Sequence, residues 1–272
     1  MTMKRNISDA IQRPRVVALL QARTSSTRLP GKVLSDVVGA PMILRQIERI
    51  RLARMLDHLI VATSVDSSDD KLAEIVSAQG VQVVRGKLDD VLDRFAVALR
   101  TVNAQHVVRL TGDCPLVDPD VVDVIVGHHL VSRADITTNA FEPTFPDGLD
   151  VEVVRADVLL IAAQEAQKKY EREHVTPFIY ERPQRFRIVH YRAPVDLSGL
   201  RWTVDEPEDL VFVREVFAAL YPSNPTFRMH HVLKLLSERP ALSELNTRFT
   251  RNAGLARSIA AEEAARQPGD PA

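Results

Sequence analysis

Short runs of valine, isoleucine, leucine and alanine alternate with longer amphipathic stretches along the first half of the chain. The pattern predicts strands at 16–21, 58–63, 81–85, 106–110 and 134–138, and helices at 41–54, 69–79, 88–102 and 119–131. Short continuous apolar runs indicate strands buried on both faces, whereas apolar residues three and four apart indicate helices. Repeated strand–helix units with short connections are typical of an α/β fold with a doubly wound, mostly parallel sheet and helices on both faces.

The second half of the chain continues this alternation less regularly. Further strands are expected at 148–154, 186–191 and 201–205, and further helices at 156–169, 172–181, 207–220 and 228–238. No stretch rich in glycine or serine separates the halves, so we predict a single domain over 14–240, divided at about 140/141. Residues 1–13 are expected to be an N-terminal extension. Residues 250–272 carry few large apolar side chains and are expected to be a mobile tail.

Composition and charge exclude several classes of function. The 35 basic and 36 acidic residues are mixed along the chain and give a net charge of −1, whereas nucleic-acid binding normally needs a basic face. No run approaches the ~18 apolar residues of a membrane span. Cys114 is the only cysteine, and the polar N-terminus has no apolar signal core. We therefore expect a cytoplasmic protein that binds neither nucleic acid nor a membrane.

The loop QARTSSTRLPGK, at 21–32, follows the first predicted strand. It places Arg23, Arg28 and Lys32 around a Pro30-Gly31 turn, with small hydroxyl side chains between them. Cations and accessible backbone N–H groups suit a triphosphate. The loop lacks the glycine and the Ser/Thr of a Walker A motif, and the chain contains no G-x-G-x-x-G. A solvated basic loop is an equally good interpretation of these residues alone.

Two aspartates are expected at strand ends, where ligands bind in doubly wound sheets. Asp113 follows Gly112 after the fourth strand, and Asp205 ends the stretch RWTVD. Carboxylates there can hold Mg²⁺ together with phosphate oxygens, although Asp113 alone is more simply a turn-capping residue. The pair Asp118-x-Asp120 matches the DxD of nucleotide-sugar glycosyltransferases, but its position before Pro119 favours helix capping.

A third group of polar residues lies in the second half. Asp150 and Glu152 are two apart in a predicted strand, so both side chains face the same side, where they could bind sugar hydroxyls or lie exposed at an edge. Arg172 and His174 lie close together in EREHVTP, although a lone histidine is more often structural than catalytic.

With these residues in place, the chain resembles the cytidylyltransferases that make CMP-activated acidic sugars, the CMP-Kdo and CMP-acylneuraminate synthetases. Its resemblance is greatest to the SpsF-like group of spore coat polysaccharide proteins. The matching stretches, within 16 to about 220, are ARTSSTRLPGKVL, LIVATS, DDVLDRF, RLTGDCPLVDP, PDGLDVEV, REHVTPFIY and RWTVDEPEDL.

The resemblance implies a Rossmann-like nucleotidyltransferase fold, with a nucleotide-binding half at 14–140 and an acceptor-sugar half at 141–240. It implies Mg²⁺ as cofactor, CTP or another nucleoside triphosphate and a sugar as substrates, and a homodimer. Arg28, Lys32 and Asp113 would be catalytic, and Asp113 and Asp205 would bind the metal. The nucleotide would contact Gln21, Ala22, Arg23, Ser26, Thr27, Arg28, Gly31, Lys32, Arg94 and Gly112. The sugar would contact Asp150, Glu152, Arg172 and His174.

The expected reaction transfers CMP from CTP to an acidic or modified sugar and releases pyrophosphate, for surface polysaccharide or glycan biosynthesis. Two other functions remain open at this point. One is a glycosyltransferase that uses a nucleotide-sugar donor, and the other is a nucleotide-binding protein without turnover.

Overall fold

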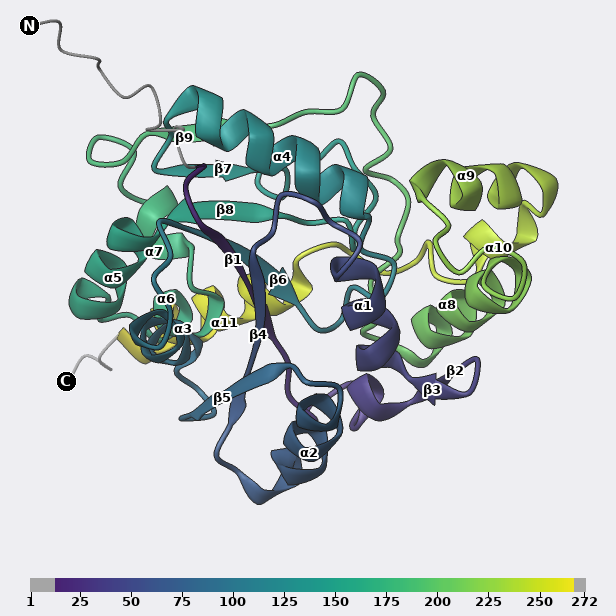
Figure 1. The fold of residues 1–272 in the computed structure, drawn as a ribbon, viewed down its shortest axis with the longest axis horizontal. Coiled ribbons are helices and arrows are strands. Elements are labelled where there is room, and N and C mark those ends of the chain that lie inside the picture. Colours follow the sequence, from purple (N-terminus) through teal and green to yellow (C-terminus); the bar gives the residue numbers. More distant parts are fainter. Residues whose placement is uncertain (1–12, 267–272) are drawn as a thin grey trace, which may run out of the picture.

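The computed structural model describes residues 13–266, and its centre is a seven-stranded sheet in the order β5-β4-β1-β6-β8-β7-β9 (Figure 1). The strands are β1 (Val16–Gln21), β4 (His58–Ser64), β5 (Gln82–Gly86), β6 (His106–Thr111), β7 (Ile136–Thr138), β8 (Glu152–Arg155) and β9 (Ile188–His190). Only β8 runs antiparallel to its neighbours. The predicted doubly wound, mostly parallel sheet is therefore confirmed. Apart from Arg13, the predicted N-terminal extension lies outside the described residues.

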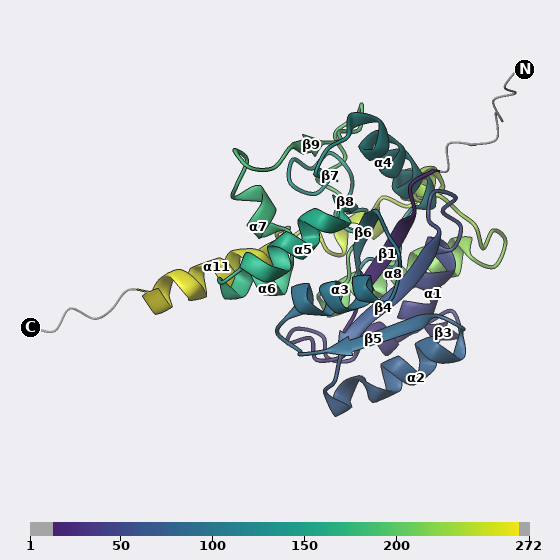
Figure 2. The ribbon, with the colours of Figure 1, turned by 60° about the vertical axis from the view of Figure 1, so that its left-hand side comes forward.

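Helices cover both faces of the sheet (Figure 2). One face packs against α1 (Met42–Ile50), α2 (Asp70–Ala78), α4 (Pro119–Ser132), α8 (Pro207–Leu220) and α9 (Met229–Glu238). The other packs against α3 (Val91–Arg100), α5 (Ala156–Glu165) and α7 (Pro177–Tyr180). Alternate residues of β1 enter the two cores, because successive strand side chains point to opposite faces. Among residues 13–266, no helix is long and apolar enough to cross a membrane.

The strand order has its switch point at β1, which pairs with β4 on one side and β6 on the other. The chain leaves β1 and β6 at the same carboxyl edge, and the Gly112 N–H donates to the Gln21 carbonyl at 2.7 Å. Ligands of doubly wound sheets bind at this kind of crevice. The basic loop after β1 and the Asp113 turn after β6 therefore lie side by side, as predicted.

Two predicted elements of the second half differ in the structure. The helix expected at 172–181 is two pieces, α6 (Lys169–His174) and α7, separated at Val175, whose φ is 74°. Pro177 fits the break, because it has no N–H to donate to the preceding turn and suits the first turn of a new helix. The strand expected at 201–205 is also absent. Its only sheet-like contact is an isolated bridge between Arg201 and Asp147.

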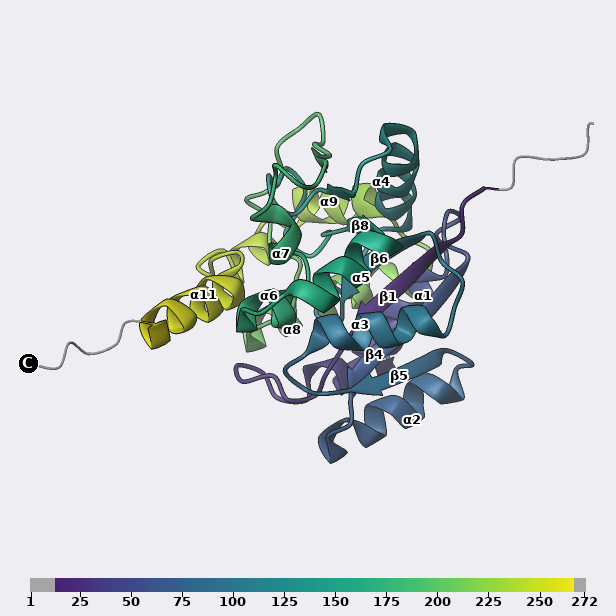
Figure 3. The same cartoon turned by 90° about the vertical axis from the view of Figure 1, so that its left-hand side faces the viewer.

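The segment expected to be a mobile tail, from residue 250, is described up to residue 266 and contains a helix. Residues Ala253–Arg266 form helix α11, which packs against α6 (Figure 3). The segment is held mainly by polar contacts, including Arg251 Nη1 to the Phe145 carbonyl at 3.1 Å and an ion pair between Arg251 and Asp150. A criterion based on large apolar side chains does not detect such contacts. Residues 267–272 lie outside the described part of the chain.

The buried carboxylate of Asp69 anchors the basic loop. It accepts hydrogen bonds from the Thr24 N–H at 2.7 Å, the Thr24 hydroxyl at 2.8 Å, and the Ser64 N–H and hydroxyl. The loop also closes on itself, since the Gly31 N–H donates to the Thr24 carbonyl at 2.8 Å and Gly31 has a φ of 72°. A left-handed φ of this kind favours glycine. These bonds hold the loop in a defined conformation at the end of β1.

We expect Asp69→Asn to lower the free energy of unfolding by about 1–3 kcal/mol, because buried donors lose their acceptor. Burial alone would raise the pKa of Asp69, but the bonds from Ser64 and Thr24 outweigh it and hold this pKa below its ordinary value. The carboxylate therefore stabilises the fold above its unfolded pKa, and this contribution is lost as the pH falls through the folded pKa.

The melting temperature at pH 7 measures this effect, because each kcal/mol of stability shifts it by about 2–4 °C. The difference in melting temperature between Asp69→Asn and wild type should become smaller below about pH 4. Asp70→Asn is the matched control, because the Asp70 side chain is 63 % exposed. Equal melting temperatures for Asp69→Asn and Asp70→Asn would contradict the anchoring role.

Candidate functional site

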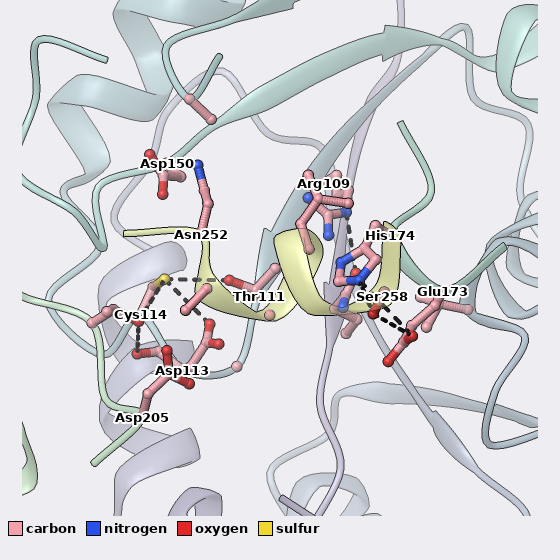
Figure 4. A pocket seen from close by; sticks show the side chains of 18 of the residues that line it. Arg109, Thr111, Asp113, Cys114, Asp150, Glu173, His174, Asp205, Asn252 and Ser258 are labelled. Atoms are coloured by element: carbon pink, nitrogen blue, oxygen red, sulfur yellow. Dashed lines mark hydrogen bonds and ion pairs between the residues drawn. The ribbon is translucent and has the colours of Figure 1, made fainter. Parts of the chain in front are cut away.

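A cavity of about 770 Å³ opens at the carboxyl edge of the sheet, beside the ends of β1 and β6 (Figure 4). Nearly all residues predicted to contact substrates line it: Gln21, Ala22, Arg23, Ser26, Thr27, Arg28, Lys32, Arg94, Gly112, Asp113, Asp150, Glu152, His174 and Asp205. Residues from both halves of the chain and from α11 thus share one cavity.

Lys32 lies between the two predicted metal ligands. Its Nζ donates to Asp205 Oδ1 at 2.9 Å and to the Val204 carbonyl at 2.6 Å, and lies 3.7 Å from Asp113 Oδ2. Arg28 reaches the same cluster, with Nη2 at 2.9 Å from Asp205 Oδ2 and Nη1 at 3.2 Å from Glu206. The basic loop is therefore directly joined to the carboxylates of both Asp113 and Asp205.

The backbone explains why Asp113 and Asp205 meet across 92 positions of sequence. The Val204 N–H donates to the Asp113 carbonyl at 2.7 Å, and the Thr203 hydroxyl donates to the same oxygen at 3.2 Å. Burial would raise the pKa of Asp113, but the Lys32 cation and nearby hydrogen bonds hold it below its ordinary value. Asp113 is therefore a carboxylate at neutral pH.

The two carboxylates suit a divalent cation that is shared with a substrate. Asp113 and Asp205 side chains are 31 % and 20 % exposed, and both line the cavity. Within residues 13–266, no group of three or more Asp, Glu, His and Cys could hold a metal by itself. Mg²⁺ is commonly bound in this way, by one or two carboxylates together with substrate phosphates.

Arg94, on α3, is a buried cation with unused donors in the cavity wall. It is 2 % exposed, and its Nε and Nη1 have no hydrogen-bond partner among the described residues. Burial and the nearby Arg23 lower its pKa to about 10, so it remains charged at neutral pH. Gly86 makes room for it, since a Cβ there would lie 2.7 Å from Arg94 Cγ. A buried guanidinium with free donors fits an anionic ligand, which would satisfy both the charge and the N–H groups.

Glu152 and Asp150 also line the cavity, and each is already paired with an arginine. Glu152 accepts from Arg109, from the Thr176 hydroxyl at 2.9 Å and from the Tyr180 hydroxyl. Asp150 pairs with Arg251, yet burial raises its pKa to about 7. These carboxylates are held in place and present oxygens to the cavity.

Two predicted site residues do not line the cavity. Arg172 donates from Nε to Asp90 at 2.8 Å and from Nη1 to the carbonyls of Ala163 and Ala166 at 3.1 and 3.0 Å. Its guanidinium therefore joins α6 to α3 and α5 rather than lining the cavity where a sugar ligand was expected. Gly31 acts through the loop conformation described above and does not itself line the cavity.

Several cavity residues were not predicted from sequence: Arg109, Thr111, Phe141, Asp147, Tyr180, Asn252 and Ser258. Arg109 and Asp147 lie within the quoted motifs RLTGD and PDGLD, so their closeness to Asp113 and Asp150 was an available signal. Asn252 and Ser258 belong to the segment expected to be mobile, and no sequence pattern placed them here.

Asp118 and Asp120 lie outside the cavity. Asp118 is the N-cap of α4 and accepts from the Asp120 N–H at 2.8 Å and the Val121 N–H at 3.4 Å. Asp120 pairs with Arg228 at 3.2 Å. The capping interpretation is confirmed, and the glycosyltransferase hypothesis loses its predicted metal ligands.

Comparison with known proteins shows the family of this chain. The cytidylyltransferase family matches residues 17–222. The spore coat polysaccharide biosynthesis protein SpsF of Bacillus subtilis is 33 % identical, over 83 % of this chain and 95 % of its own length. A cytidylyltransferase structure from Leptospira borgpetersenii superposes with a TM-score of 0.82 at 30 % identity, and covers 87 % of this chain and 100 % of that one.

A more distant structure shares the fold alone. It is a CMP:2-keto-3-deoxy-manno-octonic acid synthetase complexed with CTP, 22 % identical, with a TM-score of 0.60 over 75 % of this chain and 99 % of its own. The family match covers most of the described residues and includes both strand-end loops of the cavity. The chain belongs to the cytidylyltransferase family, whose members are nucleotidyltransferases.

Proposed function

We propose that the protein is a Mg²⁺-dependent sugar cytidylyltransferase, which transfers CMP from CTP to a sugar hydroxyl and releases pyrophosphate. One observation carries this proposal. The cations Arg28 and Lys32 join the carboxylates Asp113 and Asp205 in a cavity that also contains the unpartnered guanidinium of Arg94. Such a combination suits a metal-bound triphosphate better than a single phosphate or a neutral ligand.

The nucleotide would occupy the side of the cavity formed by the basic loop and α3. Arg28, Lys32 and Arg94 supply positive charge there, and Arg23 is only loosely held by Glu173, at 3.5 Å. Bound Mg²⁺ would neutralise phosphate charge and orient the triphosphate, held by Asp113 and Asp205 together with phosphate oxygens. The fixed loop conformation places the cations before the substrate arrives, so little reorganisation is needed during the reaction.

The chemical step is an in-line displacement at the α-phosphorus. The sugar hydroxyl oxygen forms the new bond to the α-phosphorus and gives its proton to water. The bond between the α-phosphorus and the oxygen that bridges to the β-phosphate breaks, and pyrophosphate leaves with that electron pair. The protein forms no covalent bond, so positioning and charge stabilisation supply the acceleration. Arg28 and Lys32 are placed to stabilise the charge that develops on the transferring and leaving phosphates.

The acceptor would occupy the side lined by Asp150, Glu152 and His174. We expect this acceptor to be an acidic or modified sugar used for surface polysaccharide or glycan biosynthesis. The names of two similar proteins support this expectation, because one refers to a spore coat polysaccharide and the other to a keto sugar acid. Carboxylates fixed by arginine pairs are good acceptors for sugar hydroxyls, which are directional donors.

The decisive experiment measures pyrophosphate release by the purified protein with CTP, UTP, ATP or GTP and Mg²⁺, over a panel of acidic, amino and neutral sugars. The proposal expects release that needs both CTP and a sugar, with a CMP-sugar as product. Nucleotide binding without product from any combination would instead support the non-catalytic alternative.

Arg28→Ala should weaken CTP binding about 10- to 100-fold, because a charged hydrogen bond contributes about 1.5–3 kcal/mol. Calorimetric titration with CTP and Mg²⁺ checks this. Arg54→Ala is the matched control, since the Arg54 side chain is 84 % exposed and pairs with Asp123, on α4. Equal affinities for the two variants would remove Arg28 from the nucleotide site.

Asp113→Asn and Asp205→Asn should each reduce the Mg²⁺-dependent part of CTP binding, because neutral amides are poor ligands for a hard cation. The measurement is the CTP-induced rise in melting temperature, with Mg²⁺ or with EDTA. Asp120→Asn is the control, because the glycosyltransferase hypothesis places the metal there. A Mg²⁺ effect that survives in both cavity variants and disappears in Asp120→Asn would reverse the assignment.

A further inference from the structure

Helix α11 brings one hydroxyl group into contact with two residues of α6 (Figure 4). Ser258 Oγ lies 3.1 Å from His174 Nε2 and 3.2 Å from Glu173 Oε2. All three residues line the cavity. The acceptor side is therefore closed partly by a segment that lies beyond residues 17–222, the part of the chain matched to the family.

The proton count of this contact fixes the direction of both hydrogen bonds. A serine hydroxyl has one proton, and a carboxylate only accepts. Ser258 therefore donates to Glu173, and its oxygen accepts from His174. For that bond, His174 must carry a proton on Nε2.

His174 is neutral at physiological pH, so it has only one ring proton. Burial lowers its pKa to about 4, and Arg109 and Arg23 act in the same direction, although Glu173 and Glu152 oppose them. With the proton on Nε2, Nδ1 has a free lone pair. Among the described residues, His174 Nδ1 has no hydrogen-bond partner, and the ring lines the cavity.

We propose that Ser258 is a positioning residue that fixes the Nε2-protonated tautomer of His174, so that Nδ1 accepts a hydrogen bond from a hydroxyl of the sugar acceptor. This role rests on the proposed function, because it assigns the His174 side of the cavity to the acceptor. A histidine with so low a pKa is a poor proton acceptor at neutral pH, so His174 orients the sugar rather than removing its proton.

The tautomer can be measured without any substrate. Long-range ¹H–¹⁵N correlation spectra distinguish Nδ1-protonated from Nε2-protonated rings, and His174→Gln identifies the His174 signals among the eight histidines. The wild type and Ser258→Thr, which keeps the hydroxyl, should show the Nε2-protonated form. Ser258→Ala should show a mixture of both tautomers. The wild-type tautomer persisting unchanged in Ser258→Ala would overturn the proposal.

Kinetics test the consequence for the acceptor. With the sugar that best supports pyrophosphate release, Ser258→Ala should raise the acceptor KM about 3- to 10-fold, the range for one neutral hydrogen bond, with kcat and the CTP KM nearly unchanged. Ser258→Thr should restore the wild-type KM. Ser237→Ala is the matched control, since Ser237 lies on α9 and bonds only the Lys234 carbonyl, at 2.7 Å.

The outcomes separate this inference from the proposed function. If Ser258→Ala raised only the KM for CTP, Ser258 would act at the nucleotide side. That result would overturn the inference and leave the proposed cytidylyl transfer intact. No pyrophosphate from any sugar would refute the proposed function and the acceptor role together, and the spectra would still decide whether Ser258 sets the tautomer.

Discussion

The site depends on the contacts made by the ammonium group of Lys32. It joins three segments that are distant in sequence: the loop after β1, the turn after β6 at Asp113, and the stretch that ends at Asp205. The Lys32 side chain is only 9 % exposed, so its charge requires these acidic and carbonyl partners. The two carboxylates in turn require a cation, because two negative charges close together in a partly buried site repel each other. Lys32 therefore links the basic loop, which Asp69 anchors, to both carboxylates and offsets their charge.

The sequence predicted only in part that these three segments lie together. Alternating apolar runs place Gln21 and Asp113 at one edge of the sheet, because parallel strands end together. No such rule applies to Asp205, since its segment is not a strand of the sheet. It reaches the site through a backbone bond between Val204 and Asp113, and through Arg201, whose guanidinium pairs with both Asp147 and Asp209. Such contacts depend on side-chain direction in three dimensions, which periodicity does not encode.

The sequence predicted the second half of the chain incompletely for the same reason. Arg172 and His174 are two residues apart, but the helix turns them to different surroundings, and only His174 lines the cavity. A helix advances about 100° per residue, so adjacent polar residues in a motif do not share a face. Helix α11 was missed because its composition contains little apolar surface. Its attachment is made by ion pairs and hydrogen bonds from Arg251 and Ser258.

Most charged side chains of the cavity are already paired, including Arg28 and Lys32, but Arg94 and Arg23 are less fully paired. At the end proposed for the nucleotide, Arg94 Nε and Nη1 have no hydrogen-bond partner among the described residues, and Arg23 makes a 3.5 Å contact to Glu173, longer than an ordinary charged hydrogen bond. At the end proposed for the acceptor, Glu152 and Asp150 are each paired with an arginine. Available cations attract a polyanion from a distance, and their effect is weakened by salt.

Carboxylates already paired with arginine add little long-range attraction, but they fix the positions of acceptor atoms and so select a ligand by geometry. Glu173 contacts both ends, because one oxygen faces Arg23 and the other accepts from Ser258. A triphosphate that draws Arg23 away would leave Glu173 with its bond to Ser258, and so would leave the acceptor side intact. Charge-driven nucleotide capture and geometric selection of the sugar can therefore operate in one cavity without competing for the same side chains.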